Sequence, residues 1–227
     1  MSASSVERIL DSKCDPPVAG YLHRPKNVLR NALVLTHGAG SNSQTSLLIS
    51  LAEAFVDVGF LVLRCDLPFR QRSPQGPPSP GNSARDQKGL RNAVFFVRNL
   101  ATGSAFLGGH SYGGRQASML AASDPGLVAG LLLLSYPLHP PRKPEQLRTQ
   151  HFPNLRTPAL FVHGSRDPFG SASEMQEALT LIPARTKLLL IDSAGHDLGL
   201  RKAANENTES SMSTRTRDEF QAFFSER

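Results

Sequence analysis

Apolar residues along this chain form short continuous runs, and between these runs they recur at helical spacing. The runs predict buried strands over residues 32–36, 60–65, 104–107, 129–135, 159–162 and 187–191. The helical windows predict helices over residues 47–58, 83–97, 116–122, 171–181 and 214–224. Strands that alternate with helices indicate an α/β fold, with a mostly parallel central sheet and helices on both faces.

Two of the predicted helices begin with a capping-box pattern. Ser83 is followed three residues later by Asp86, and Ser171 is followed at the same spacing by Glu174. A hydroxyl at the N-cap and a carboxylate three residues on each satisfy a free backbone N–H. Both helices are therefore expected to start at these serines.

Two segments rich in proline and glycine interrupt the alternation, over residues 66–82 and 137–158. Both follow strands, so both are expected at the carboxyl edge of the sheet, where open α/β sheets bind ligands. They are either irregular surface loops or the lips of a substrate cleft. On the second interpretation Phe69, Arg70 and His139 contact substrate.

The segment between the third strand and its helix carries the pattern Gly-x-Ser-x-Gly, with Gly109, Ser111 and Gly113 in the fixed positions. This is the pattern of a nucleophile elbow, a strained strand-to-helix turn on which neighbouring side chains would clash. Because a strand precedes it and a helix follows it, the sequence predicts that Ser111 is a nucleophile.

A serine nucleophile needs a histidine to take its proton and a carboxylate to orient that histidine. In the order typical of α/β hydrolases, the acid and then the base follow the serine along the chain. Asp167, just after the strand over residues 159–162, is the expected acid, with Asp192 and Asp197 as competitors. His196, after the last strand, is the expected base.

The oxyanion of an acyl-transfer intermediate needs preorganised N–H donors. We expect one donor from the backbone of Tyr112, at a helix N-terminus, and one from Ala39 in the glycine-rich turn after the first strand. Gly40 is the alternative donor and otherwise contacts substrate. The same turn lacks the spacing of a phosphate-binding loop.

Bulk properties narrow the class of protein. The 227 residues suit one domain over residues 1–227. The net charge is +6, but the basic residues are scattered along the chain and no nucleic-acid motif accompanies them. A preference for anionic substrates stays open. Neither a membrane-spanning run nor a metal-ligand spacing is present in the sequence, and the polar N-terminus lacks a signal-peptide core, so we expect a cytoplasmic protein without membrane contact or cofactor.

Five motifs carry a resemblance to a known family. They lie at residues 35–40 (LTHGAG), 64–69 (RCDLPF), 113–115 (GGR), 136–141 (YPLHPP) and 164–170 (GSRDPFG). The chain resembles α/β-hydrolase-fold proteins, and within them the dienelactone-hydrolase-like group that includes testis-expressed protein 30 and KAT8 regulatory NSL complex subunit 3.

This resemblance implies the α/β-hydrolase sheet and the triad Ser111, Asp167 and His196. Dienelactone hydrolases proper use a cysteine where this chain has Ser111, and larger hydrolases insert a lid domain where this chain has only residues 137–158. The cleft is therefore expected to be open, and the expected function is a serine hydrolase for small-molecule esters whose acyl groups do not need deep apolar burial. Amides, thioesters and acyl transfer stay open, and the alternative is an interaction module that keeps the fold without its chemistry.

Overall fold

The computed structural model describes residues 5–26, 31–199 and 206–225, so the two ends of the predicted 1–227 domain lie outside the described residues. Its strands form one eight-stranded sheet in the order β1-β2-β4-β3-β5-β6-β7-β8. The strands are β1 (Ser5–Asp11), β2 (Val18–Arg24), β3 (Ala32–Thr36), β4 (Leu61–Cys65), β5 (Ala105–His110), β6 (Gly130–Leu134), β7 (Ala159–Gly164) and β8 (Thr186–Ile191).

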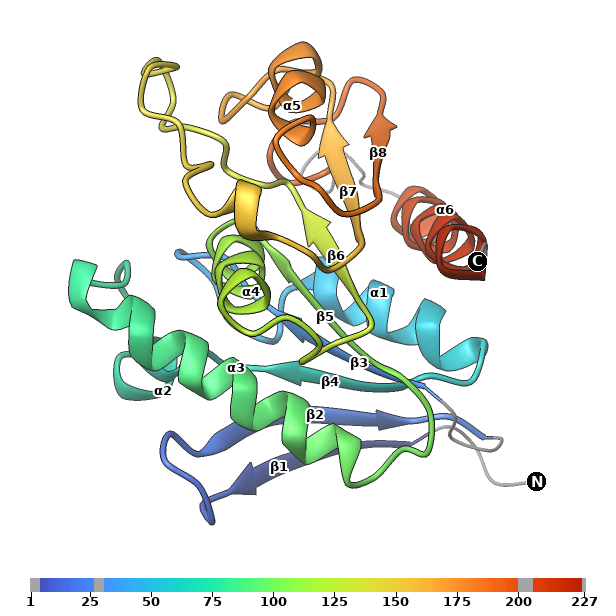
Figure 1. Ribbon diagram of the computed structural model, residues 1–227. Helices are drawn as coiled ribbons and strands as arrows, with labels where there is room; N and C mark the ends of the chain where they lie inside the picture. Colours follow the sequence, from blue (N-terminus) through green and yellow to red (C-terminus); the bar gives the residue numbers. More distant parts are fainter. Residues whose placement is uncertain (1–4, 27–30, 200–205, 226–227) are drawn as a thin grey trace.

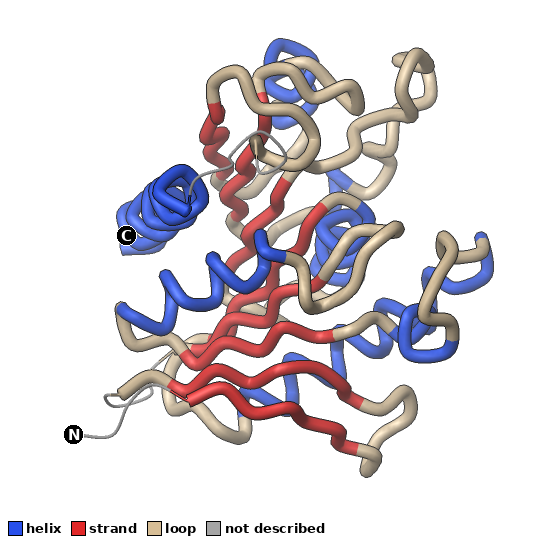
Figure 2. The backbone as a smooth tube through the Cα atoms, turned by 180° about the vertical axis from the view of Figure 1, so that it is seen from behind, coloured by secondary structure: helices blue, strands red, loops and turns tan. Residues whose placement is uncertain are grey.

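The six strands from β3 to β8 pair in parallel, and the hairpin of β1 and β2 adds to β4 in the antiparallel direction. The strong twist of the sheet is visible from both sides (Figures 1 and 2). Because the parallel strands run the same way, the loops after β3, β5, β7 and β8 meet at one edge. The mostly parallel α/β sheet predicted from the sequence is confirmed.

Helices cover both faces of the sheet (Figure 1). On one face α1 (Ser46–Asp57) and α6 (Glu206–Ser225) lie together, and Phe55 and Phe220 meet edge to face at 5.1 Å between ring centroids. On the other face lie α3 (Ser83–Arg98), α4 (Tyr112–Ser123) and α5 (Ala172–Leu179). Two separate clusters of buried apolar side chains, one on each face, hold these layers together.

Two strands and one α-helix of the described residues were not predicted, namely β1, β2 and the short α2 (Pro68–Arg72). All seven residues of β1 are exposed or only partly covered, and they contain no apolar run, so hydrophobic patterning gives no signal there. The expected lid-free architecture holds among the described residues, where the segment between β6 and β7 contains only a 3-10 turn at Phe152–Asn154.

The two predicted capping boxes had different outcomes. Ser171 and Glu174 form one at the start of α5, with both reciprocal hydrogen bonds present. The prediction at Ser83 and Asp86 is wrong, because Asn82 is the N-cap of α3 and no side chain caps it. Instead the Ser83 hydroxyl donates to Gln116, and Asp86 serves tertiary partners near the site described below.

Candidate active site

Ser111 lies on the turn between β5 and α4 with the backbone angles φ 51° and ψ −116°, which are strained for a residue other than glycine. The flanking glycines make this turn possible. A Cβ on Gly109 would lie 2.7 Å from the Gly113 carbonyl carbon, and a Cβ on Gly113 would lie 2.5 Å from the His37 carbonyl oxygen. The predicted nucleophile elbow therefore has the expected geometry.

Three side chains that are far apart in the sequence form one hydrogen-bonded chain at this edge. The Nε2 atom of His196 lies 2.8 Å from the Ser111 Oγ atom. On the other side of the ring, Nδ1 lies 2.8 Å from Oδ2 and 3.0 Å from Oδ1 of Asp167. The sequence-predicted serine, acid and base are thus brought together, and neither Asp192 nor Asp197 takes the place of Asp167.

The Asp167 carboxylate is fully buried, and its own loop supports it. Its Oδ1 atom also accepts the Phe169 N–H at 2.9 Å, while the Phe169 ring stacks on the His196 ring with centroids 4.1 Å apart. Gly164 permits the close approach of the two loops, since a Cβ there would lie 2.4 Å from the Gly195 carbonyl oxygen. Asp167 and His196 are therefore held by both the loop after β7 and the loop after β8.

His110, next to the nucleophile, lies under the histidine loop as part of its support. Its Nε2 atom lies 2.8 Å from the His196 carbonyl oxygen, which a neutral ring satisfies by donating N–H. Burial lowers the pKa of His110 to about 4, so the ring is neutral at physiological pH. His110 thus supports the backbone of His196 and takes no part in the hydrogen-bonded chain from Ser111 to Asp167.

The glycine-rich turn after β3 lies directly against the nucleophile. A Cβ on Gly38 would lie 3.1 Å from His110 Nδ1 and 3.5 Å from Ser111 Cβ. The His37 ring fixes the start of the turn, since its Nδ1 atom lies 2.8 Å from the Gly38 carbonyl oxygen and its Nε2 atom accepts the Leu67 N–H at 3.1 Å. Burial lowers the pKa of His37, consistent with the neutral ring that this pair of contacts requires.

Tyr112 begins α4 immediately after the nucleophile, so its backbone N–H belongs to the unpaired first turn of the helix. Its side chain points to α3, where its hydroxyl donates to Asp86 Oδ2 at 2.8 Å and its ring meets Phe69 edge-on at 5.7 Å. Asp86 also accepts the Phe69 N–H at 3.0 Å. Burial raises the pKa of Asp86, and these two hydrogen bonds oppose the rise.

Of the four residues predicted to contact substrate, one is exposed and three are buried. Gly40 is exposed, and nothing lies within 4 Å of the position of a Cβ there. Phe69, Arg70 and His139 are only 3%, 6% and 5% exposed. Phe69 packs against His37 and Tyr112, Arg70 donates to backbone carbonyls, and His139 Nδ1 lies 2.8 Å from the Pro140 carbonyl oxygen. The protein itself thus surrounds almost all of the surface of these three side chains, and their contact with substrate stays a prediction.

Sequence reasoning missed the supporting function of Asp86 and Arg70. Asp86 was interpreted as half of a capping box, and Arg70 as a substrate contact. No local pattern marks a side chain whose partners lie 17 to 31 residues away, as the Phe69 and Tyr112 partners of Asp86 and the Ala39 partner of Arg70 do.

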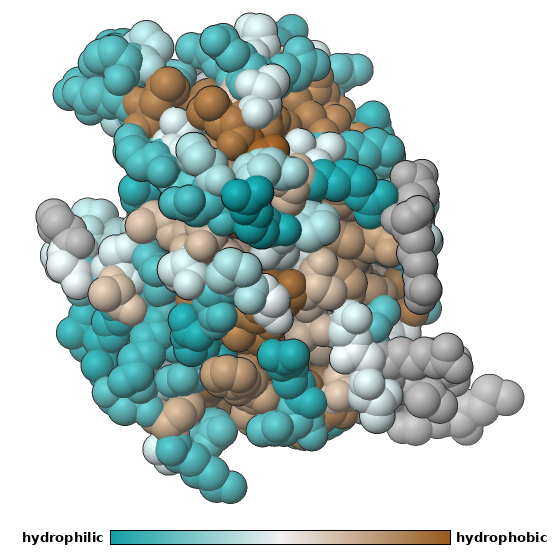
Figure 3. Space-filling view, in the orientation of Figure 1, coloured by the Kyte–Doolittle hydropathy of each residue, from teal (hydrophilic) through white to brown (hydrophobic). Residues whose placement is uncertain are grey.

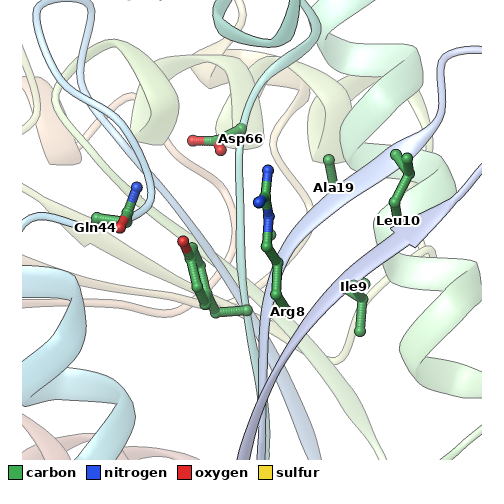
Figure 4. A pocket seen from close by; sticks show the side chains of 8 residues that line it. Arg8, Ile9, Leu10, Ala19, Gln44 and Asp66 are labelled. Carbon is green, nitrogen blue, oxygen red and sulfur yellow. The ribbon is translucent and has the colours of Figure 1, made fainter.

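Two hollows lie away from Ser111. One, of about 430 Å³, lies between the β1–β2 hairpin and the loop before α1, with Arg8, Tyr21, Gln44 and Asp66 among its lining residues (Figure 4). The other, of about 330 Å³, lies between α5 and the loop after β6 and includes Leu138, Leu147 and Leu181. Figure 3 shows hydrophobic residues gathered at the top of the view, the part of the molecule that contains α5.

Among the described residues, no group of three or more His, Cys, Asp or Glu side chains is placed to hold a metal ion. Within the same part of the chain, no helix is long and apolar enough to cross a membrane. Cys14 and Cys65 are both free thiols, and burial raises the pKa of Cys65 to about 12.

Solved structures with the same fold cover almost the whole chain. A dienelactone hydrolase from Anabaena variabilis is 18% identical with a TM-score of 0.76, over 98% of this chain and 99% of that one. Est1E from Butyrivibrio proteoclasticus is 16% identical with a TM-score of 0.75, over 96% and 99%. An esterase domain of a Rhodothermus marinus protein is 14% identical with a TM-score of 0.69, over 97% and 99%.

At these identities the structures show the fold, and the family follows from the sequence match. Residues 29–225 match the model of an alpha/beta hydrolase domain. The match spans the whole parallel part of the sheet, including the elbow, the acid loop and the histidine loop. The chain therefore belongs to the alpha/beta hydrolase family and has the fold of its dienelactone hydrolase-like members.

Proposed function

We propose that this protein is a serine hydrolase that cleaves small carboxylic esters through an acyl-enzyme on Ser111. The observation that carries the proposal is the continuous chain from the Ser111 hydroxyl through His196 to Asp167, with 2.8 Å at each link. A serine hydroxyl is a weak nucleophile at neutral pH, and this arrangement is the one that activates it.

In the proposed reaction the Ser111 oxygen attacks the ester carbonyl carbon while His196 Nε2 takes the hydroxyl proton. Asp167 holds the Nδ1–H of the ring and stabilises the imidazolium that forms. The oxyanion accepts hydrogen bonds from the N–H groups of Ala39 and Tyr112. The intermediate collapses, and His196 gives its proton to the departing alcohol. A water molecule then attacks the acyl-enzyme with His196 again as base, which releases the acid and restores Ser111.

The position of the Ala39 N–H supports its assignment. In a trans peptide the N–H points opposite to the preceding carbonyl. The Gly38 carbonyl oxygen is held by His37 Nδ1 at 2.8 Å and by the Ser41 N–H at 3.2 Å, within the turn. The N–H of Ala39 therefore faces away from these partners, on a turn that abuts Ser111.

The architecture favours short or openly bound acyl groups, because the described segment between β6 and β7 contains no helical lid. The names of two structural neighbours, an esterase and a dienelactone hydrolase, are in line with ester chemistry. The reaction written above requires neither metal nor organic cofactor. A cytoplasmic location, a small-molecule substrate and the absence of nucleic-acid and membrane partners stay predictions from the sequence.

Covalent labelling tests the proposal directly. A fluorophosphonate probe is expected to label the wild-type protein stoichiometrically and to fail with Ser111→Ala. Ser123→Ala, on the exposed end of the same helix, is the matched control and keeps full labelling. A screen of p-nitrophenyl esters of graded length then defines the acyl preference. No labelling of well-folded wild-type protein contradicts the proposal and favours the interaction module.

A further inference from the structure

Arg70 lies in α2 with its guanidinium buried beneath the turn after β3. It donates four hydrogen bonds, all to backbone carbonyl oxygens. Nε reaches Ser41 and Nη2 reaches Ala39, each at 2.8 Å, while Nη2 also reaches Gly76 at 3.0 Å and Nη1 reaches Ser73 at 3.1 Å. One side chain thus ties the glycine-rich turn to the loop that follows α2.

This environment is costly for a charge unless every partner is in place. Arg70 is 6% exposed, and among the described residues no carboxylate lies within ion-pair distance of it. A buried cation without a counter-ion depends on its hydrogen bonds for compensation. The planar fork of a guanidinium suits several carbonyls at fixed angles, which the point charge of a lysine does not.

The turn that Arg70 contacts has little rigidity of its own. Glycines flank Ala39 on both sides, and the space around Gly40 is open. Glycine permits a peptide plane beside it to rotate at low cost. Such a rotation at the Ala39–Gly40 peptide would turn its carbonyl oxygen toward the site, where its partial negative charge would repel the oxyanion that the Ala39 N–H stabilises. The Arg70 bonds to the Ala39 and Ser41 carbonyls oppose this rotation.

We propose that Arg70 is the positioning residue of the oxyanion turn, which holds the Ala39–Gly40 peptide with its carbonyl away from Ser111 and the turn's N–H groups toward the substrate. The inference rests on the proposed hydrolase function. It makes Arg70 act on the transition state through the backbone and not through contact with substrate.

The first experiment compares Arg70→Met with Arg72→Met, an exposed arginine two residues away in α2 whose guanidinium bonds to Asn82. With p-nitrophenyl acetate, we expect Arg70→Met to lower kcat by about 10- to 100-fold, less than the loss of a direct oxyanion donor. KM is expected to change by less than about threefold, since ground-state binding is not affected. Arg72→Met is expected to match the wild type, and Arg70→Lys to stay close to Arg70→Met.

A second readout does not depend on catalysis. In ¹H–¹⁵N spectra of Arg70→Met, the Ala39 and Gly40 amide signals are expected to shift strongly or broaden, while signals from the β1–β2 hairpin stay in place.

A third experiment tests chemical rescue. In Arg70→Ala, millimolar guanidinium is expected to recover part of kcat, with no gain in the wild type or in Arg72→Met.

The outcomes separate the two proposals. If the wild type hydrolyses esters and folded Arg70→Met keeps its kcat and its Ala39 and Gly40 signals, the positioning function of Arg70 is overturned. If the wild type, Arg70→Met and Arg72→Met show neither hydrolysis nor fluorophosphonate labelling, the hydrolase proposal fails, and the proposed effect of Arg70 on catalysis fails with it. Circular dichroism identifies a misfolded Arg70→Met, in which case Arg70→Lys carries the comparison.

Discussion

The two sides of the candidate site differ in the groups that face the substrate position, which are side chains on one side and backbone on the other. After β5, β7 and β8 the proposed reacting groups are side chains, and His196 contacts both Ser111 and Asp167. After β3 the proposed reacting group is the backbone N–H of Ala39, and the side chains Arg70 and His37 act from behind by holding carbonyl oxygens. Loss of a side chain on the first side removes a reacting group. Loss of a side chain on the second side leaves the backbone N–H in the chain and only weakens the contacts that orient it.

This difference implies a graded response to mutation. Substitution on the triad side is expected to remove most of the activity at once. Substitution on the oxyanion side is expected to cost less, because the N–H groups themselves stay in the chain. The expected effects below run from the largest to the smallest.

The largest loss is expected for Ser111→Ala and His196→Ala. Each removes a member of a unit that acts together, so kcat for a p-nitrophenyl ester is expected to fall by about 10⁴- to 10⁶-fold. The double variant is expected to lose no more than either single variant. Steady-state kinetics on purified protein measures this, and a residual rate within tenfold of the wild type would contradict the triad assignment.

A slightly smaller loss is expected for Asp167→Asn, which keeps the shape of the acid but presents an amide to His196 Nδ1. The ring then tends to the wrong tautomer, and kcat is expected to fall by about 10⁴-fold. Asp192→Asn, an exposed competitor for the acid function, is the control and is expected to have no effect. Equal losses in the two variants would show that Asp167 is not the acid.

Gly113→Ala tests the contact between the two sides. The added methyl would lie 2.5 Å from the His37 carbonyl oxygen and 2.7 Å from the Thr36 side chain, so the turn after β3 must move away from α4. We expect a loss of about 1–3 kcal/mol in unfolding free energy, together with about a tenfold loss of kcat. Urea unfolding and kinetics measure both. Gly81→Ala, where a Cβ has open space, is the control.

The smallest expected effect is the dependence of stability on pH, which involves one histidine at the site and one on the hairpin strand β2. Burial lowers the pKa of both His110 and His23 to about 4, and the Arg64 charge adds to the effect at His23. Between pH 4 and pH 6.5 the unfolded chain therefore binds more protons than the folded protein, so stability falls as the pH is lowered through this window.

For His23, which is 3% exposed, the loss between pH 7 and pH 5 is expected to be about 2 kcal/mol at most. His23→Gln keeps an acceptor for the Arg64 Nε–H and is expected to flatten the dependence of unfolding free energy on pH. Denaturant unfolding at several pH values measures the slope. An unchanged slope in the variant would contradict a neutral buried His23.

Much of the fold was predictable because burial leaves a pattern. All six predicted strands are present within two residues at their starts, and the capping box at Ser171 is confirmed. The hairpin strand β1 was missed because its mostly exposed side chains show no run of apolar residues. The capping box at Ser83 was predicted wrongly because Asp86 has partners on α2 and α4 that no local rule contains.

The sequence by itself determined which residues are candidates for the chemistry, because a Gly-x-Ser-x-Gly elbow and the order of serine, acid and histidine are features of spacing, order and residue type. Only the tertiary structure decided which polar residues work and which support. Phe69, Arg70 and His139 lie in segments that follow strands at the site edge, yet all three are buried against the protein. The physical reason is that a side chain's function depends on its direction and its partners, and these are set by segments distant in the sequence.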